Sequence, residues 1–334
     1  MTQNYTAGWA SYVNYGFEST YGTVTTGTRI FGLGQKITHT RRNNMERLFG
    51  LSNRNAQANV AKRYEGTASV EFVLSNASFF RAVLGKVADA GSGPSSYTHT
   101  YTENITNSSP YDPRVPSFSI LTATEMGTND EVVALIGCKV NSMTLTAAEN
   151  ELVRVRLEVP YKTETMTNTG IGSAVVDTES PFAFEHGLVE FTGGGGSIGV
   201  VTSFELTLNN NLEGLWGLSS RYKSVDVELR REYNIRMTVA FNNTATLLEK
   251  FYGHAAPLAA TDLATLNPAA QATIVLTFNN GVDAIVITLA NIYFDEDTLP
   301  KSIDEITKED VTGWALSGTS IVCTNSVSTD AGSP

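Results

Sequence analysis

Apolar and polar residues alternate along most of the chain, and this alternation predicts β-strands. In the stretch SVDVELR, Val225, Val227 and Leu229 fall on one face, and the residues between them fall on the other. A period of two is typical of a strand with one buried face. The pattern recurs in KITHT, SVEFVL, EVVALIGCKV, SFELTL, IRMTVAF, ATIVLTF and VDAIVITL. Asn280 and Gly281, between the last two stretches, predict a tight hairpin turn.

Two short segments break this alternation, and each predicts one helix. The apolar residues of 79–84 and of 247–252 are spaced so that they form a single stripe on a helix. A glycine, Gly85 or Gly253, follows each segment, as is common at helix C-termini. The residues expected to cap the N-termini are Asn76 or Ser78, and Asn243 or Thr246.

The chain repeats itself at an offset of half its length. Residues 43–76 match residues 210–243 at twelve of 34 positions with a constant offset of 167, most clearly in NMERLFGLSNR and NLEGLWGLSSR. A fixed offset of this kind indicates a duplicated structural unit. We therefore predict a mainly β fold with two tandem small β-sandwich or barrel domains, each flanked by one short α-helix. The expected divisions are 1–165 with an N-terminal arm, a linker at 166–187, and 188–334 with a loose C-terminal tail.

Composition permits a substantial core and argues against a grip on nucleic acid. Of 334 residues, 41% are hydrophobic and 17% charged, and the formal net charge is −11. Proteins that hold phosphate backbones carry basic patches, whereas here the arginine pairs at Arg41–Arg42 and Arg230–Arg231 are isolated. Any contact with double-stranded DNA is expected to be transient and non-adhesive. Cys138 and Cys323 lie far apart and are expected to be free, buried thiols.

No motif assembles a catalytic, cofactor-binding or metal site, and we expect no enzyme activity and no cofactor. GGGGSIG (193–199) has dinucleotide-type glycine spacing, but an alternating strand pattern follows it where a helix is required. The acidic run 294–311 lacks the glycine of a calcium loop and is expected to be a solvated face. The N-terminus does not have the pattern of a signal peptide. The most apolar stretch is shorter than the ~18 residues of a membrane span. These features predict no membrane insertion, and a protein that is made and kept in the cytoplasm until assembly.

Aromatic residues gather in two polar segments that are candidates for contacts between subunits. The segment 5–28 carries Trp9, Tyr12 and Tyr15, and the long Ser/Thr/Pro/Gly-rich stretch 89–116 carries Tyr97 and Tyr101. Aromatic side chains in polar, extended segments often dock onto a partner. Docking of the N-terminal segment onto the chain's own sheet is the equal alternative. A loop as long as 89–116 is usually functional or disordered.

In the order and composition of its segments, the chain resembles the major tail tube proteins of long-tailed, siphovirus-type bacteriophages and related archaeal viruses. The resemblance covers most of the chain and is carried by SYVNYGFESTYGT, RYEGTASVEFVLSNASFFRAVLG, GVVTSFELTLNNNLEGLWGLSSR, NIRMTVAFNNTATLLEKFYG, LIGCKVNSMTLT and ITLANIYFD. It implies a structural subunit of the virion tail whose rings stack into a hollow conduit for DNA ejection. The implied partners are other copies of the chain and tail proteins such as the tape measure, tail terminator and tail tip.

The duplication departs from the single domain that is usual in this family, and it suggests that three chains form a ring of six similar units. Three chains at −11 give a ring of −33, so the bore is expected to be acidic or neutral. The candidate lumen-facing residues are Asn59, Glu71, Asp226 and Glu228. The alternative from another class is a non-enzymatic β-sandwich surface or binding module, either a capsid decoration or a carbohydrate-binding protein.

Overall fold

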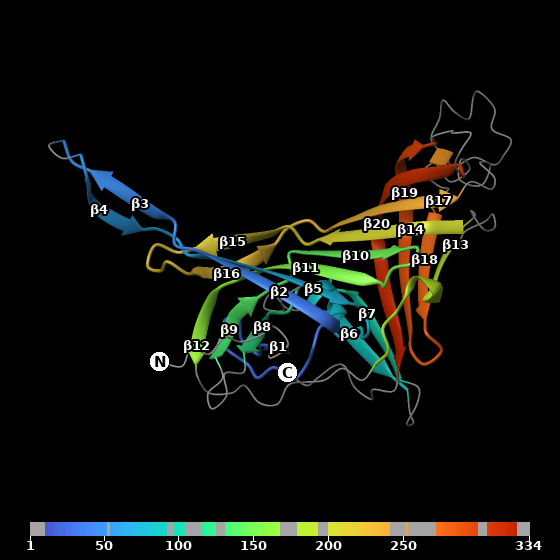
Figure 1. Ribbon diagram of the computed structural model, residues 1–334, viewed down its shortest axis with the longest axis horizontal. Coiled ribbons are helices and arrows are strands. Elements are labelled where there is room, and N and C mark those ends of the chain that lie inside the picture. The colour runs from blue at the N-terminus through green and yellow to red at the C-terminus, as the bar shows by residue number, and fades with distance from the viewer. Residues whose placement is uncertain are drawn as a thin grey trace.

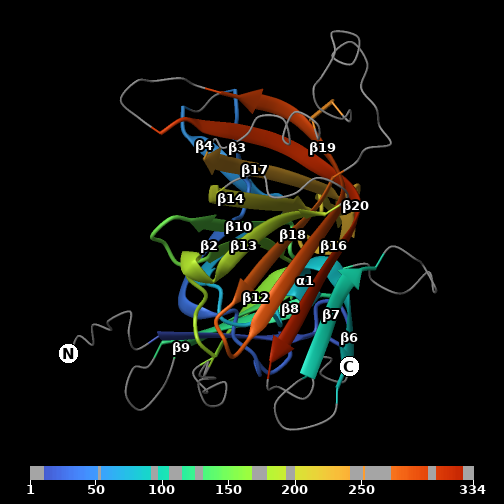
Figure 2. The same ribbon diagram turned by 90° about the vertical axis from the view of Figure 1, so that its right-hand side faces the viewer.

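The computed structural model describes residues 11–51, 54–91, 97–104, 115–124, 131–167, 179–192, 200–240, 251–252, 272–299 and 306–325. This part of the chain is mainly β, as predicted, and its strands pair antiparallel. Figures 1 and 2 show long strands stacked side by side in one large sheet, with a smaller sheet packed across one end.

The strands that precede residue 168 are β1 (Ser11–Phe17), β2 (Leu33–Arg42), β3 (Met45–Phe49), β4 (Ala56–Ala61), β5 (Glu65–Val73), β6 (Gly85–Ala90), β7 (Tyr97–Glu103), β8 (Phe118–Thr124), β9 (Glu131–Cys138), β10 (Ser142–Ala148), β11 (Arg154–Tyr161) and β12 (Thr163–Thr167). Those that follow are β13 (Gly187–Thr192), β14 (Val200–Asn209), β15 (Leu212–Trp216), β16 (Lys223–Glu228), β17 (Glu232–Ala240), β18 (Ala272–Asn279), β19 (Ala284–Thr298) and β20 (Lys308–Asn325). The helical elements are α1 (Phe80–Leu84) and the 3₁₀ turn η2 (Phe184–His186). We call β1–β12 with α1 the first unit and η2 with β13–β20 the second unit.

A single sheet runs through both units. Its order is β13-β18-β19-β20-β17-β14-β10-β11-β5-β2, and β7 and β6 add to it beside β20. A separate four-stranded sheet, β1-β8-β9-β12, packs on the strands that the first unit contributes to the large sheet. The hairpins β3–β4 and β15–β16 each form a separate two-stranded sheet. One hydrophobic cluster fills the space between these layers and contains residues of both units. The alternation seen in the sequence thus sets which face of each strand this shared core buries.

Local geometry repeats between the units at the offset found in the sequence. β2, β3, β4 and β5 correspond to β14, β15, β16 and β17, each shifted by 167 residues. Both hairpins carry the same register irregularity, at Leu48/Phe49 and at Leu215/Trp216. Asn44 and Asn211 adopt positive φ angles of 45° and 47°. Their side-chain amides donate to the equivalent carbonyl oxygens of residues 63 and 230, over 3.0 and 2.9 Å.

The later strands also correspond, at an offset of 154 that sequence identity does not reveal. In the first unit Leu157 pairs with Val70 and with Met143. In the second unit Val311 pairs with Met237, the equivalent of Val70, and with Asp297. β19 therefore occupies the places of both β9 and β10, and β20 those of β11 and β12. The offsets differ because the chain between α1 and β8 is longer than the corresponding chain before β18.

The first predicted helix is confirmed over Phe80–Leu84, and it ends at Gly85, whose φ is 111°. The predicted cap was wrong. Phe79 occupies the N-cap position without a side-chain hydrogen bond, and Asn76 instead accepts a bond from the backbone N–H of Ser78. Most of the second predicted helix, 247–252, lies outside the described residues. The hairpin at Asn280–Gly281 is confirmed, with Gly281 at a φ of 87°.

Two predicted surface segments are more deeply built into the fold than the sequence suggested. Within the stretch 89–116, β7 pairs with both β6 and β20, so this part is a sheet strand and not a loop. Within the acidic run 294–311, Glu309 is only 3% exposed, and one carboxylate oxygen each of Asp297 and Glu309 is buried without a hydrogen-bond partner. These two residues occupy the places of Met143 and Val155, which are buried core residues of the first unit.

Replacing Glu309 by valine, the residue at the equivalent position 155, is expected to stabilise the isolated chain. Burial raises the pKa of Glu309, and the nearby charge of Asp297 raises it further. The folded chain therefore contains a poorly solvated carboxyl group. Removing a buried polar group that lacks a partner should increase the unfolding free energy by about 1–3 kcal/mol in urea denaturation. Glu205→Val on the exposed face of β14 is the matched control, and an equal gain from it would contradict this explanation.

Candidate assembly interface

The two units meet where β10 of the first pairs with β14 of the second, and we call this pairing the internal junction. Its register runs from Ser142 opposite Asn209 to Ala148 opposite Ser203. The core-facing pairs, Met143 with Leu208 and Leu145 with Leu206, are fully or almost fully buried. The units are therefore joined by backbone hydrogen bonds and an apolar face at once.

Polar groups fix the register of the internal junction. On its exposed face, the hydroxyl oxygens of Thr144 and Thr207 lie 3.4 Å apart. At its end, the backbone N–H of Asn210 donates to the carbonyl oxygen of Asn141 over 2.7 Å. The N–H of Leu212 donates to the side-chain oxygen of Asn141 over 2.8 Å. A shift of one residue would break these bonds and turn the apolar side chains outward.

Equivalent strand edges at the two ends of this arrangement have no strand partner among the described residues. β2, the equivalent of β14, is hydrogen-bonded to β5 on one side only. The distal part of β19, residues 293–298, takes the place of β10 and pairs with β20, whereas β18 reaches only to Ile292. Exposed strand edges pair readily with other chains. Among the described residues, two equivalent edges at separate places are therefore available to pair with a further strand.

The hairpin β15–β16 lies against the first unit and is anchored by buried charges. Asp226 is 2% exposed, forms an ion pair with Lys223 at 2.6 Å and accepts a hydrogen bond from the Tyr21 hydroxyl. Lys139 bonds both the carbonyl oxygen of Asp226 and the carboxylate of Glu228, over 3.0 and 2.6 Å. Burial lowers the pKa of Lys223 even though Asp226 favours its charged form. The buried roles of Lys139 and Lys223 could not be predicted from the sequence, because single lysines next to strands usually face solvent.

Among the described residues, no buried charged side chain anchors the corresponding hairpin β3–β4. It projects away from the rest of the chain (Figure 1), and every residue of β3 is exposed. Its exposed apolar side chains include Met45, Leu48, Phe49 and Val60, and Leu51 follows at the turn. A run of exposed apolar side chains on a projecting hairpin is typical of a surface that is covered by a partner.

The four candidate lumen residues lie in different settings. Asn59 is exposed on the projecting β4, and Glu71 is partly exposed on β5 beside Arg154, with 4.0 Å between charged atoms. Asp226 and Glu228 lie in the anchor of β15–β16, where they are engaged by this chain's own lysines. Their assignment to a bore remains a prediction.

The candidate aromatic contacts divide between core and surface. Tyr15 is fully buried and stacks on Phe31 with 4.4 Å between ring centroids, so this part of the N-terminal segment docks onto the chain's own sheet. Tyr101 is 1% exposed and also belongs to the core. Neither can present a surface to another subunit. Tyr12 and Tyr97 are partly exposed on β1 and β7, and Trp9 lies outside the described residues.

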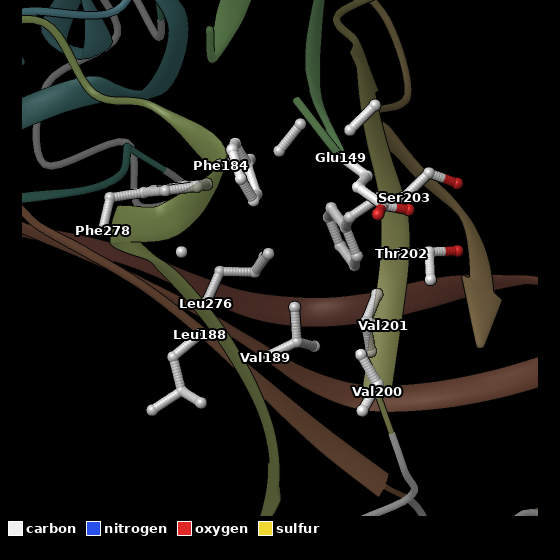
Figure 3. Close-up of a pocket in the computed structure, with 14 residues that line it drawn as sticks. Glu149, Phe184, Leu188, Val189, Val200, Val201, Thr202, Ser203, Leu276 and Phe278 are labelled. Carbon is white, nitrogen blue, oxygen red and sulfur yellow. The ribbon is translucent and has the colours of Figure 1, made fainter. Parts of the chain in front are cut away.

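An apolar cleft of about 240 Å³ opens beside the internal junction (Figure 3). Phe184, Leu188 and Phe278 face Val200 and Val201 across it, and its lining contains no histidine, lysine or cysteine. The cleft therefore offers apolar contact and no general base beyond Glu149. Among the described residues, no group of three or more His, Cys, Asp or Glu side chains could hold a metal ion. No described helix is both long and apolar enough to cross a membrane.

Open strand edges and a projecting apolar hairpin are surfaces of the kind that pair with other chains. Comparison with protein families agrees, because the model of the phage tail tube protein family matches residues 8–321. The chain belongs to that family, whose members are structural components of the virion tail. No curated protein matches the sequence. Cys138 and Cys323 are free and buried, as expected.

Asp226→Asn should destabilise the chain by about 3 kcal/mol in urea denaturation, because it leaves the Lys223 ammonium group buried without its counter-ion. The double variant Asp226→Asn/Lys223→Met should recover much of this loss, since it removes both charges. If the double variant is as unstable as the two single losses added together, the two residues do not act as a pair. Glu213→Gln on β15 serves as a control for the loss of a carboxylate from the same hairpin.

Proposed function

We propose that three copies of this chain close into a ring of six similar units, and that these rings stack into a hollow tail tube through which double-stranded DNA leaves the virion. The observation that carries the proposal is the internal junction. It joins two similar units within one chain, and equivalent edges stand open on β2 and on the distal part of β19. If the turn between successive units is constant and six units complete a full circle, repeating that junction between chains generates a closed ring.

The exposed face of the large sheet supports a conduit that does not retain DNA. Arginine and glutamate side chains alternate on it, for example at Arg154 beside Glu71 and at Arg156 beside Glu158, with charged atoms 4.0 and 2.7 Å apart. If this face lines the bore, these two arginines are already partnered by carboxylates. Many additive lysine and arginine contacts with phosphate would slow the passage of DNA. A lining of balanced charge allows free movement.

The hairpin β3–β4 is the second element of the proposed ring. Its equivalent β15–β16 rests on the preceding unit of the same chain, so β3–β4 would rest on the preceding unit of a neighbouring chain. That contact would cover Leu48 and Phe49, which are 45% and 65% exposed in the single chain. The family resemblance implies tail proteins such as the tape measure, tail terminator and tail tip as further partners of the tube.

Electron cryomicroscopy of the assembled protein tests the ring. Three chains per ring, with both units of each chain in one layer and pseudo-sixfold symmetry, is the expected result. Six whole chains per layer, or small particles without rings, would overturn the proposal, and the second outcome would favour a surface-binding module. The assembled tubes should also fail to retain DNA on a filter at physiological salt.

Leu48→Ser/Phe49→Ser should leave the fold intact and reduce assembly. Both side chains are exposed in the single chain, so the unfolding free energy should change by less than about 0.5 kcal/mol. Ring formation, measured by light scattering after size-exclusion chromatography, should be lost or weakened at least tenfold. Val282→Ser, at an apolar position that is 78% exposed on the β18–β19 turn, is the control. Unchanged assembly in the hairpin variant would exclude the hairpin from the interface.

A further inference from the structure

We propose that the junction between neighbouring chains is an antiparallel pairing of β2 with the distal part of β19 in one fixed register, held by two ion pairs: Arg42 opposite Glu296, and Arg41 opposite Asp297. This inference rests on the proposed ring and specifies its contact. The partner is a second copy of this chain.

The register follows from the equivalence of the two units. β14 corresponds to β2 at the offset of 167, and β10 corresponds to the end of β19 at the offset of 154. In the internal junction Ser142, Met143 and Thr144 lie opposite Asn209, Leu208 and Thr207. Transferring both offsets places Glu296, Asp297 and Thr298 of one chain opposite Arg42, Arg41 and Thr40 of the next. The two offsets and the register of the internal junction together determine this alignment of β2 with β19.

One pair of residues is the same in both junctions. Thr144 and Thr207, whose hydroxyl oxygens are 3.4 Å apart, become Thr298 and Thr40. Both of these threonines are exposed in the single chain and lie on strand edges that lack a partner among the described residues. Cross-strand threonine pairs stabilise antiparallel strands. The identity at this position therefore supports the same register for the second junction.

The neighbouring pairs change from uncharged to oppositely charged. The buried apolar pair Met143–Leu208 becomes Asp297–Arg41. In the single chain one carboxylate oxygen of Asp297 is buried and has no hydrogen-bond partner. Arg41 donates from Nε to Glu164 over 2.7 Å, and its guanidinium group carries further N–H donors. A neighbouring Arg41 would supply the cation that the Asp297 side chain lacks.

The second pair, Ser142–Asn209, becomes Glu296–Arg42, and both members are exposed in the single chain. An edge with two arginines meets an edge with two carboxylates. β2 carries Lys36, Arg41 and Arg42 and no carboxylate, so pairing two copies of β2 would bring only basic side chains together, and like charges near one another destabilise a sheet. The charges thus disfavour symmetric pairing of two like edges, which would end growth at a dimer, and they favour the head-to-tail contact that a ring requires.

Charge reversal tests the ion pairs. Arg41→Glu and Asp297→Arg should each reduce ring formation at least tenfold by light scattering, and a mixture of the two single variants should form mixed junctions with each other. The double variant Arg41→Glu/Asp297→Arg should restore rings. Arg236→Glu, an exposed arginine on the interior strand β17, should assemble normally. Circular dichroism and thermal melting of each single variant establish that it is folded.

Cross-linking tests the register independently of charge. In Thr40→Cys/Thr298→Cys, mild oxidation should link neighbouring chains, giving dimers and then closed trimers in denaturing gels. The shifted pair Thr38→Cys/Thr298→Cys, on the same sheet face, should not cross-link, because disulfides require Cα atoms within about 7 Å. The native Cys138 and Cys323 are buried and should not interfere.

The outcomes separate this inference from the proposed ring. If the wild-type chain forms no rings, the proposed function fails. If wild-type rings form and the Arg41→Glu variant assembles as well as the wild type, or if the shifted cysteine pair cross-links instead of the pair at 40 and 298, the ring stands and this junction is overturned.

Discussion

The backbone of an edge strand presents N–H and C=O groups that require partners, and this requirement organises the whole molecule. Within the chain this requirement is met where β10 pairs with β14. Two sheets that would each end in an open edge strand are thereby joined into one sheet. The hairpin β15–β16, anchored by Lys139 and Asp226, and the β6–β7 arm on β20 hold the units in that arrangement. The same groups have no strand partner on β2 among the described residues, and the pairing with another copy that we propose has the same physical cause as the internal pairing.

Much of the fold could be predicted because strand periodicity reports burial directly. The helix 80–84, the Asn280–Gly281 turn and the first half of the repeat all depend on local backbone chemistry that the sequence displays. Asn44 and Asn211, for example, recur because both adopt a left-handed conformation and bond an equivalent carbonyl oxygen. The second half of the repeat could not be found from the sequence. Strand pairing constrains where a residue lies and whether it is buried, but it does not constrain which amino acid it is. Val155 and Glu309 occupy equivalent places, although the first side chain is apolar and the second carries a carboxyl group.

The interface was harder to predict, because alternation tells which residues share a face but not what covers that face. Tyr15 and Tyr101 looked like surface aromatics from composition and proved to be core residues. Asp226 shares its strand face with other polar residues and is nevertheless covered by the first unit through Tyr21 and Lys139. Arg41 and Asp297 are 256 positions apart in the sequence. The pairing that we propose for them follows only from two strand registers, which no local pattern contains.

The pairing of β7 with the end of β20 joins residues 97–102 to residues 320–325. On the ribosome, β7 emerges more than two hundred residues before the strand it must join. The second unit's part of the large sheet is therefore completed only after nearly the whole chain has been translated. Non-local contacts of this kind form late, because the entropy of closing the intervening chain must be overcome first. A nascent chain consequently passes through most of its synthesis without a finished second unit.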